Sequence, residues 1–153
     1  MPRIVLTNRI PASPQQCFEL SLSVDAHTAS MSHSEERAVG GVTSGLIRLG
    51  DTVSWHAKHF GLPFTMTVRI SEFDAPQRFV DEQVSGPFRS WWHEHLFEPV
   101  AGGGTLMTDT VEFEAPAGAV GRVVSRFVLT GYLTRLLAGR NRWLIEALSP
   151  PAA

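Results

Sequence analysis

The sequence predicts an α+β fold, a curved antiparallel sheet of six to seven strands closing on a long C-terminal helix. Three observations lead to this prediction. Residues 37–116 contain short runs rich in Val, Thr, Phe and Trp, separated by closely spaced turn signals, a pattern typical of an antiparallel meander. One strand and two short helical segments precede this stretch, and a long apolar helical segment follows it. Because strands and helices are largely segregated along the chain, an α+β arrangement is favoured over alternating β-α units.

The first elements are a strand and a capped helix. Residues 3–10, "RIVLTNRI", have the composition of a strand. In the segment that follows, Ser13 stands where a helix N-cap belongs, Pro14 suits the first helical position, and Gln16 completes a capping box. A second short helix is expected to start at Asp25, in the polar segment "DAHTASMSHSEE".

Turn signals divide the central stretch into strands. They lie at "GLP" (61–63), "DAPQ" (74–77), "SGP" (85–87) and "AGGG" (101–104). The glycines of "GGVTSGLIRLGD" match neither the dinucleotide-binding fingerprint nor the Walker pattern. They are therefore interpreted as bulges or bends in a curved sheet.

The segment from residue 117 to residue 148 reads as one long helix with two apolar stripes. One stripe contains Val120, Val124 and Phe127, and the other contains Leu129, Leu133, Leu137 and Leu144. A helix that is apolar on more than one side packs on more than one side or covers a cavity. The helix is also basic, through Arg122, Arg126, Arg135, Arg140 and Arg142. Such a helix could attract an anionic membrane surface or an acidic partner. Because these arginines are scattered around the helix, a solvated and partly dimer-facing surface is the favoured interpretation.

Composition limits the class of protein. A chain of 153 residues is expected to form one domain, spanning 1–148, with a loose tail at 149–153. The hydrophobic content is 43%, the charged content is 18% and the net charge is -2, which gives no electrostatic reason to expect a nucleic acid as partner.

The compartment follows from cysteine usage and from the apolar runs. The single cysteine, Cys17, excludes an intramolecular disulfide and favours a reducing compartment. The N-terminal apolar run, Ile4 to Leu6, is too short for a signal peptide, and no run is long enough for a transmembrane segment. A cytoplasmic location is expected.

Several segments resemble bacterial members of the START-like superfamily, also called SRPBCC. The most telling are "FVDEQ" (79–83), "HEHLF" (93–97) and the pair Thr108–Asp109. This superfamily includes polyketide cyclases, lipid-transfer START domains and the birch pollen allergen family. The resemblance implies a helix-grip fold, in which the sheet wraps the long helix and leaves a deep cavity for an apolar or amphipathic small molecule. Because members carry, sense or convert their ligands, the resemblance does not choose an activity.

The alternation of side chains along a strand predicts which way the histidines face. Around "HEH", carboxylates and threonines concentrate in the even-numbered set of each strand, so the odd-numbered sets should face the interior. A hairpin over "VAGGG" places Phe97 opposite Met107 and therefore His95 opposite Asp109. Both His93 and His95 are then predicted to look inward, with Glu94 between them looking outward.

Three interpretations of the inward histidines remain open. A metal site would need further ligands, for which His59 and Asp109 are the candidates, although no ligand-spacing motif links them. Alternatively, His95 is a core histidine that Asp109 satisfies. In the third interpretation His93 or His95 contacts a ligand or transfers protons in a functional pocket.

Neighbouring strands supply the rest of the predicted cavity. A three-residue turn at "SGP" would turn Asp81 and Phe79 inward, whereas a two-residue turn would turn Val80 and Glu82 inward instead. The expected ligand-binding residues are Trp55, His59, Val68, Phe79, Asp81, Trp91, His93, His95, Asp109, Phe113 and Phe127. The facing of strand 51–60 is open in the same way; its apolar residues Val53, Trp55 and Ala57 share the parity of His59 and favour His59 inward and His56 outward.

Three functions fit these observations. The leading one is binding or carriage of a small apolar or amphipathic molecule, with no cofactor and no metal. The alternative is a cyclase or dehydratase type of enzyme, in which Asp109 orients His95 as the base while His93 or Asp81 polarises a carbonyl. The third is an interaction module that forms a homodimer through the leucine stripe of the long helix.

Overall fold

A computed structural model describes residues 1–115 and 125–151 of the chain. One antiparallel sheet of seven strands forms the frame, in the order β1-β7-β6-β5-β4-β3-β2. Its strands are β1 (Arg3–Ile10), β2 (Arg37–Gly41), β3 (Thr52–His59), β4 (Leu62–Asp74), β5 (Arg78–Ser85), β6 (Ser90–Pro99) and β7 (Thr105–Glu114). The fold class predicted from the sequence is therefore confirmed.

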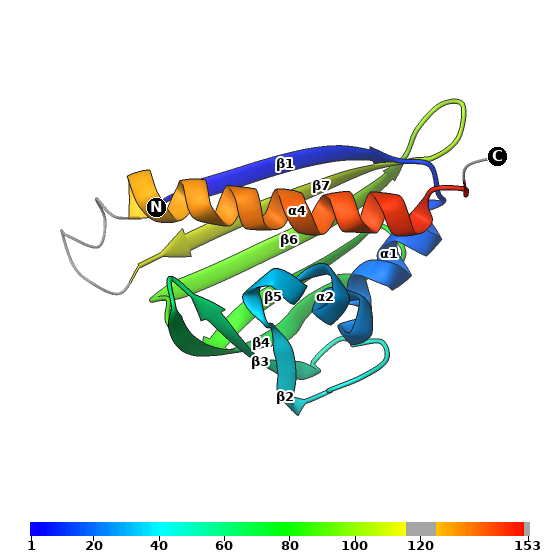
Figure 1. Ribbon diagram of the computed structural model, residues 1–153. Coiled ribbons are helices and arrows are strands. Elements are labelled where there is room, and N and C mark those ends of the chain that lie inside the picture. Colours follow the sequence, from blue (N-terminus) through cyan, green and yellow to red (C-terminus); the bar gives the residue numbers. More distant parts are fainter. Residues whose placement is uncertain (116–124, 152–153) are drawn as a thin grey trace.

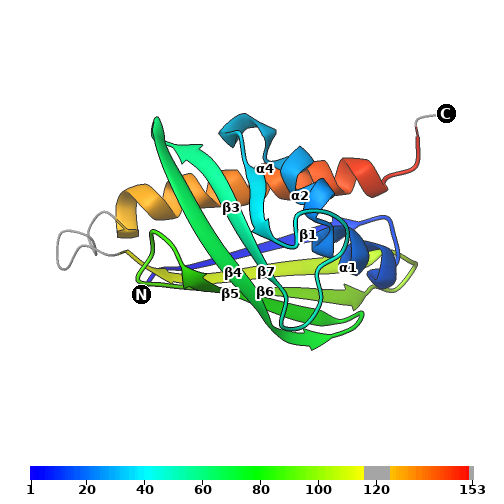
Figure 2. The same ribbon diagram turned by 90° about the horizontal axis from the view of Figure 1, so that it is seen from below.

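Helices cover one face of this curved sheet. They are α1 (Pro14–Leu22), α2 (Val24–Ser30), the short 3-10 turn η1 (Ser32–Ser34), the π-helical turn η2 (Ser125–Leu129) and α4 (Thr130–Leu148). Figure 1 shows α4 lying across the sheet, with α1 and α2 on the same side of it. Figure 2, seen from below, shows β3 and β4 crossing the direction of α4 at a steep angle. This curvature lets the sheet enclose space beneath the helix.

The start of α1 is capped as the sequence predicts. The Ser13 hydroxyl accepts a hydrogen bond from the backbone N–H of Gln16, and the Gln16 side chain accepts one from the backbone N–H of Ser13. These two bonds satisfy backbone donors that the first turn of a helix leaves without partners. Phe18 and Leu22 then lie on the buried face of α1.

The predicted hairpin between β6 and β7 has the predicted register. Phe97 pairs with Met107 and His95 pairs with Asp109. On the other side of β6, Asp81 of β5 pairs with His93. Neither turn length considered for "SGP" is right, because the last paired residues are Glu82 and Trp92. The loop beyond the last pair, Glu82 and Trp92, is longer than the three-residue turn by an even number of residues. Asp81 therefore faces the interior, as the three-residue turn predicted.

The leucine stripe of the C-terminal helix is buried within the protein. Leu133, Leu137 and Leu144 are 7%, 7% and 3% exposed, respectively. The prediction that this stripe forms a dimer surface is therefore wrong, because the sheet and the short helices already cover it. Val120 and Val124 of the other stripe lie outside the described residues, as does the predicted helical segment 117–124.

A second prediction about this helix, that Phe127 lines the cavity, is also wrong. Its side chain is 73% exposed, so it does not contribute to the wall of a cavity. The reason is that Phe127 belongs to the other stripe, and the leucine stripe is the one turned toward the sheet. Among the described residues, no helix is long and apolar enough to cross a membrane.

Candidate functional site

A cavity of about 330 Å³ lies between the concave face of the sheet and α4. Its wall comes from β3, β4, β5 and β6 on the sheet side and from α1, α2 and α4 on the helix side. Most of the lining is apolar, including Trp55, Met66, Val68, Leu133 and Leu137. This volume lies at the low end of the range of about 300–1,000 Å³ that small-molecule pockets occupy.

The structure brings most of the predicted site residues to this cavity. Its lining includes Trp55, His59, Val68, Phe79, Asp81, Trp91, His93 and His95. Phe113 is not part of the lining; it is fully buried in an apolar cluster with Ile4 and Val111, which Leu133 and Leu137 join to the cavity. Asp109 is 1% exposed and lies behind the two histidines rather than at the cavity surface. Phe127 is exposed, as described above, and is not part of the lining.

Asp81, His93, His95 and Asp109 form a buried polar cluster on one wall of the cavity. His93 Nε2 lies 3.0 Å from Asp109 Oδ1, and His95 Nε2 lies 2.8 Å from Asp81 Oδ2. His95 Nδ1 is 3.1 Å from Asp109 Oδ1, but it makes no well-aligned hydrogen bond. The two imidazoles stack with ring centroids 3.8 Å apart. Each histidine is therefore held between two carboxylates.

Aromatic side chains fix the orientation of this cluster. Phe79 stacks on the other face of His95 with ring centroids 4.1 Å apart. The indole Nε1 of Trp91 donates to Asp81 Oδ1 over 3.3 Å. These contacts follow from strand pairing, since β5 and β6 place Phe79 beside His95 and Asp81 beside His93. Packing of this kind reduces the rotamer freedom of the polar groups.

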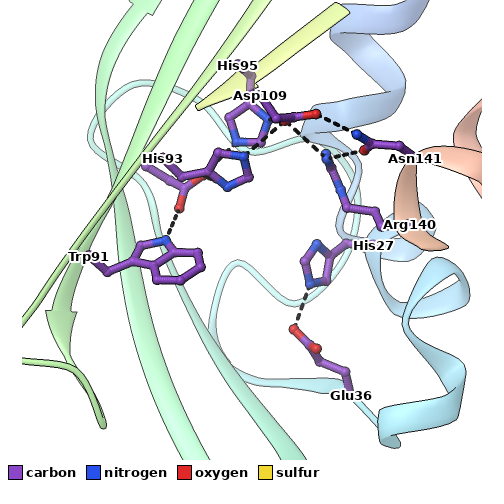
Figure 3. Close-up of polar contacts among 9 residues, drawn as sticks. His27, Glu36, Trp91, His93, His95, Asp109, Arg140 and Asn141 are labelled. Carbon is purple, nitrogen blue, oxygen red and sulfur yellow. Dashed lines mark hydrogen bonds and ion pairs between the residues drawn. The ribbon is translucent and has the colours of Figure 1, made fainter. Parts of the chain in front are cut away.

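Asp109 is anchored from behind by the C-terminal helix (Figure 3). The side-chain amide of Asn141 donates to Asp109 Oδ2 over 2.8 Å, and Arg140 Nη1 lies 3.5 Å from Asp109 Oδ1. Arg140 and Asn141 are 4% and 0% exposed. The prediction of a solvated basic helix is thus wrong for Arg140, because this arginine turns inward to a buried carboxylate. Arg135 and Arg142 are exposed.

The protonation of the cluster follows from its contacts. Burial alone would raise the pKa of Asp109, but the hydrogen bond from His93, the nearby His95 ring and the charge of Arg140 hold it well below its ordinary value. Burial would likewise raise the pKa of Asp81, but the nearby histidines lower it. Both carboxylates are therefore ionised, and they act only as hydrogen-bond acceptors.

The two histidines shift in opposite directions. Burial would lower the pKa of His95, but the carboxylates of Asp109 and Asp81, 3.1 and 2.8 Å from its ring nitrogens, raise it. For His93, burial and the neighbouring His95 lower the pKa despite the attraction of the two carboxylates. Because ionised Asp109 can only accept, neutral His93 carries its proton on Nε2 and leaves Nδ1 with a free lone pair. In a base role this geometry suits His93 better than His95, the base suggested by the sequence.

A second polar group lies elsewhere in the same cavity; sequence reasoning placed His59 there but missed His27, Glu36 and Tyr132. His27 Nε2 and Glu36 Oε1 are 2.7 Å apart, and Figure 3 draws this contact. His59 Nδ1 lies 2.6 Å from the Tyr132 hydroxyl. His27 also stacks on Trp55 with ring centroids 4.1 Å apart. Burial would raise the pKa of Glu36, but the charges of His27 and His59 lower it. The only signal in the sequence was the density of polar residues around η1.

Comparison with known proteins identifies a matching family and solved structures with a similar fold. Residues 1–144 match the family described as polyketide cyclase / dehydrase and lipid transport. None of the curated proteins matches the chain. The fold is similar to the Zhui aromatase/cyclase from Streptomyces sp. R1128, with a TM-score of 0.76 at 14% identity over 96% of this chain and 93% of that one.

Two further solved structures share the fold. A START superfamily protein from Mycobacterium smegmatis has a TM-score of 0.74 at 14% identity, covering 96% of this chain and 99% of that one. The ginseng major latex-like protein 151 from Panax ginseng has a TM-score of 0.70 at 16% identity, covering 97% and 98%. These likenesses show a helix-grip fold, as the resemblance implied.

Proposed function

Because this chain belongs to the family of polyketide cyclases, dehydrases and lipid-transport proteins, we propose that it binds a compact apolar or amphipathic small molecule in the cavity beneath α4. The observation that carries this proposal is a largely apolar cavity of about 330 Å³ whose lining includes two polar groups. Pockets that bind small molecules combine this kind of apolar lining with a few convergent polar groups.

The distribution of side chains suggests how such a molecule would lie. Its apolar part would contact Trp55, Val68 and Leu137, and its polar part would face His93 and Asp81. A carbonyl or hydroxyl group suits this wall, since a buried polar group of the ligand needs a hydrogen-bond partner. The small volume favours a molecule of a few rings over a lipid with two long chains.

Two measurements test binding. Native mass spectrometry of gently purified protein should reveal a bound molecule, and 2-naphthol should quench tryptophan fluorescence, because Trp55 and Trp91 line the cavity. Ala57, buried and in the lining, allows the space to be filled without removing a large side chain. The variant Ala57→Phe should weaken 2-naphthol binding at least tenfold.

The matched control is Val84→Phe, since Val84 of β5 is 51% exposed and outside the cavity lining. This variant should bind 2-naphthol as the unmodified protein does. An empty protein that also fails to bind the probe contradicts the proposal. Equal binding by Ala57→Phe and Val84→Phe, with both variants folded, would place the probe outside the cavity and also contradict it.

A second candidate function is acid–base conversion of the bound molecule, of the cyclase or dehydratase type. Neutral His93 favours it, since Asp109 fixes its Nε2–H and Nδ1 is left as a base. With a poly-β-ketone thioester as substrate, His93→Gln should reduce turnover by about 10²–10⁴-fold and leave probe binding intact. His56→Gln, a change on β3 outside the cavity lining, is the control. Unchanged turnover in His93→Gln rules out this role.

A further inference from the structure

Three side chains of types that bind metal ions converge at one point of the cavity wall. They are Asp81 on β5 and His93 and His95 on β6, and one ligand atom from each lies within 4.8 Å of the others. We propose that they form a binding site for a divalent transition-metal ion whose remaining coordination positions open into the cavity. This inference goes beyond the proposed function, because it requires no organic ligand.

The distances suit a common ion. Asp81 Oδ2 lies 2.8 Å from His95 Nε2 and 3.7 Å from His93 Nδ1. Ligand atoms about 2.0–2.2 Å from a zinc-like ion are separated from one another by about 3–3.5 Å, and the two observed distances bracket this range. An ion could therefore lie between the three atoms after small movements of the side chains.

The groups behind the histidines give an independent argument. A histidine that binds a metal almost always donates its other ring N–H to a carboxylate, a carbonyl or water, which fixes its tautomer and orientation. Here the other nitrogens, His93 Nε2 and His95 Nδ1, lie 3.0 and 3.1 Å from the same oxygen, Asp109 Oδ1. Asp109 is in turn held by Arg140 and Asn141. Asp109 can thus orient His93 through a hydrogen bond and lies close to the back nitrogen of His95, while the remaining nitrogens of the two histidines and Asp81 hold the ion.

The positions and charges of the surrounding side chains agree with a metal ion held by these three residues. Asp81, His93 and His95 line the cavity, whereas Asp109 is not part of the lining. An ion held by the first three would therefore have open positions on the cavity side, where water or an oxygen of a bound molecule could enter. Asp81 would partly neutralise the ion, and Arg140 would offset the charge of Asp109. Two imidazoles and one carboxylate suit Zn²⁺ or Fe²⁺.

The site differs from the metal site considered from the sequence. That site added His59 and Asp109 to the two histidines, but His59 contacts Tyr132, and Asp109 stands behind the histidines. Asp81 takes the place of the third ligand, because the pairing of β5 with β6 sets it opposite His93.

The experiment uses the full chain, freed of metal with a chelator. Titration with Zn²⁺ by calorimetry, and with Co²⁺ by visible absorption, should give one ion per chain. At a metal concentration about 100-fold above Kd, the Tm should rise by about 5–10 °C. Asp81→Asn and His95→Gln should each weaken binding by more than 100-fold, and Asp109→Asn by about 10–100-fold. His59→Gln, in the same cavity but outside the cluster, should bind as the unmodified protein does.

Three results would overturn the proposal. They are no stoichiometric binding by the unmodified chain, unchanged affinity in folded Asp81→Asn or His95→Gln, and an equal loss of affinity in His59→Gln. If either Asp81→Asn or His95→Gln fails to fold, the other variant and the unmodified chain still test the proposal. The 2-naphthol assay on chelated protein separates this proposal from the binding function, because each can fail alone. An ion on His93 Nδ1 would also exclude that nitrogen as a base, so turnover by the chelated protein tests the two roles against each other.

Discussion

Replacing Arg140 tests whether the buried cluster depends on the charge that α4 supplies. Arg140 is 4% exposed, and its Nη1 lies 3.5 Å from Asp109 Oδ1 and 3.1 Å from Asn141 Oδ1. The variant Arg140→Gln keeps a polar side chain but removes the positive charge. It leaves the carboxylate of Asp109 buried with less compensation, which is a costly state in a low-dielectric interior.

The size of this loss of stability depends on the contacts that Asp109 keeps. Breaking a buried ion pair by removing one partner costs about 3–5 kcal/mol. Asp109 keeps its hydrogen bonds with Asn141 and His93, and the contact with Arg140 is long, so we expect the lower end, about 3 kcal/mol. For a chain of this size, such a loss lowers the Tm by about 6–12 °C.

Urea unfolding followed by circular dichroism measures this loss. Arg142→Gln is the matched control, because Arg142 lies two positions along the same helix and is exposed. The control should change the free energy of unfolding by no more than about 0.5 kcal/mol. The double variant Arg140→Gln/Asp109→Asn should recover part of the loss, since the unpaired charge is gone. A loss below about 1 kcal/mol in Arg140→Gln, or one equal to that of Arg142→Gln, refutes the reasoning.

Three further predictions concern the core, the helix cap and acid stability. Phe113 is fully buried and Phe127 is 73% exposed. Phe113→Ala should therefore cost about 3–5 kcal/mol of unfolding free energy, whereas Phe127→Ala should cost at most about 1 kcal/mol. Similar losses for the two variants in chemical denaturation would contradict these placements. Ser13→Ala should cost about 1 kcal/mol through the lost cap, and thermal unfolding that shows no decrease in stability would argue against the capping box. Burial would raise the pKa of Glu36, but His27 lowers it. Because the pKa is lower in the folded state, ionised Glu36 stabilises the protein at pH values above the ordinary pKa of Glu. This stabilisation is lost as the pH falls from about 4.3 through the lowered pKa. Glu36→Gln should therefore show a shallower loss of stability than the unmodified protein in that acid range, and identical pH profiles would show that Glu36 is not so paired.

The alternation of side chains was enough to predict the wall that holds the histidines. His93 and His95 are two residues apart on one strand, so they had to share a face, and the polar residues of the other parity identified the solvent face. The "VAGGG" turn then set His95 opposite Asp109, as observed. Local rules of this kind depend only on neighbours along the chain, which is also why the capping box at Ser13 could be predicted.

The partners of Asp109 were beyond such rules. Arg140 is one of several arginines on a basic helix, and nothing in its immediate neighbours distinguishes it from Arg142. It is buried because the packing of α4 against the sheet brings it to a carboxylate that is 31 residues away in the chain. Phe127 was misplaced for the same reason, since the choice between two apolar stripes is made by the sheet and not by the helix.

The sequence by itself determined the order of the elements, the faces of the central strands and the inward direction of both histidines, because these follow from local spacing and propensity. Only the tertiary structure decided that Asp81 completes a cluster with His93 and His95, and that Arg140 and Asn141 hold Asp109 behind them. Those contacts join β5, β6, β7 and α4, and their distances depend on how far the sheet curves around the helix. The chemistry of the cavity therefore depends on the packing of distant segments.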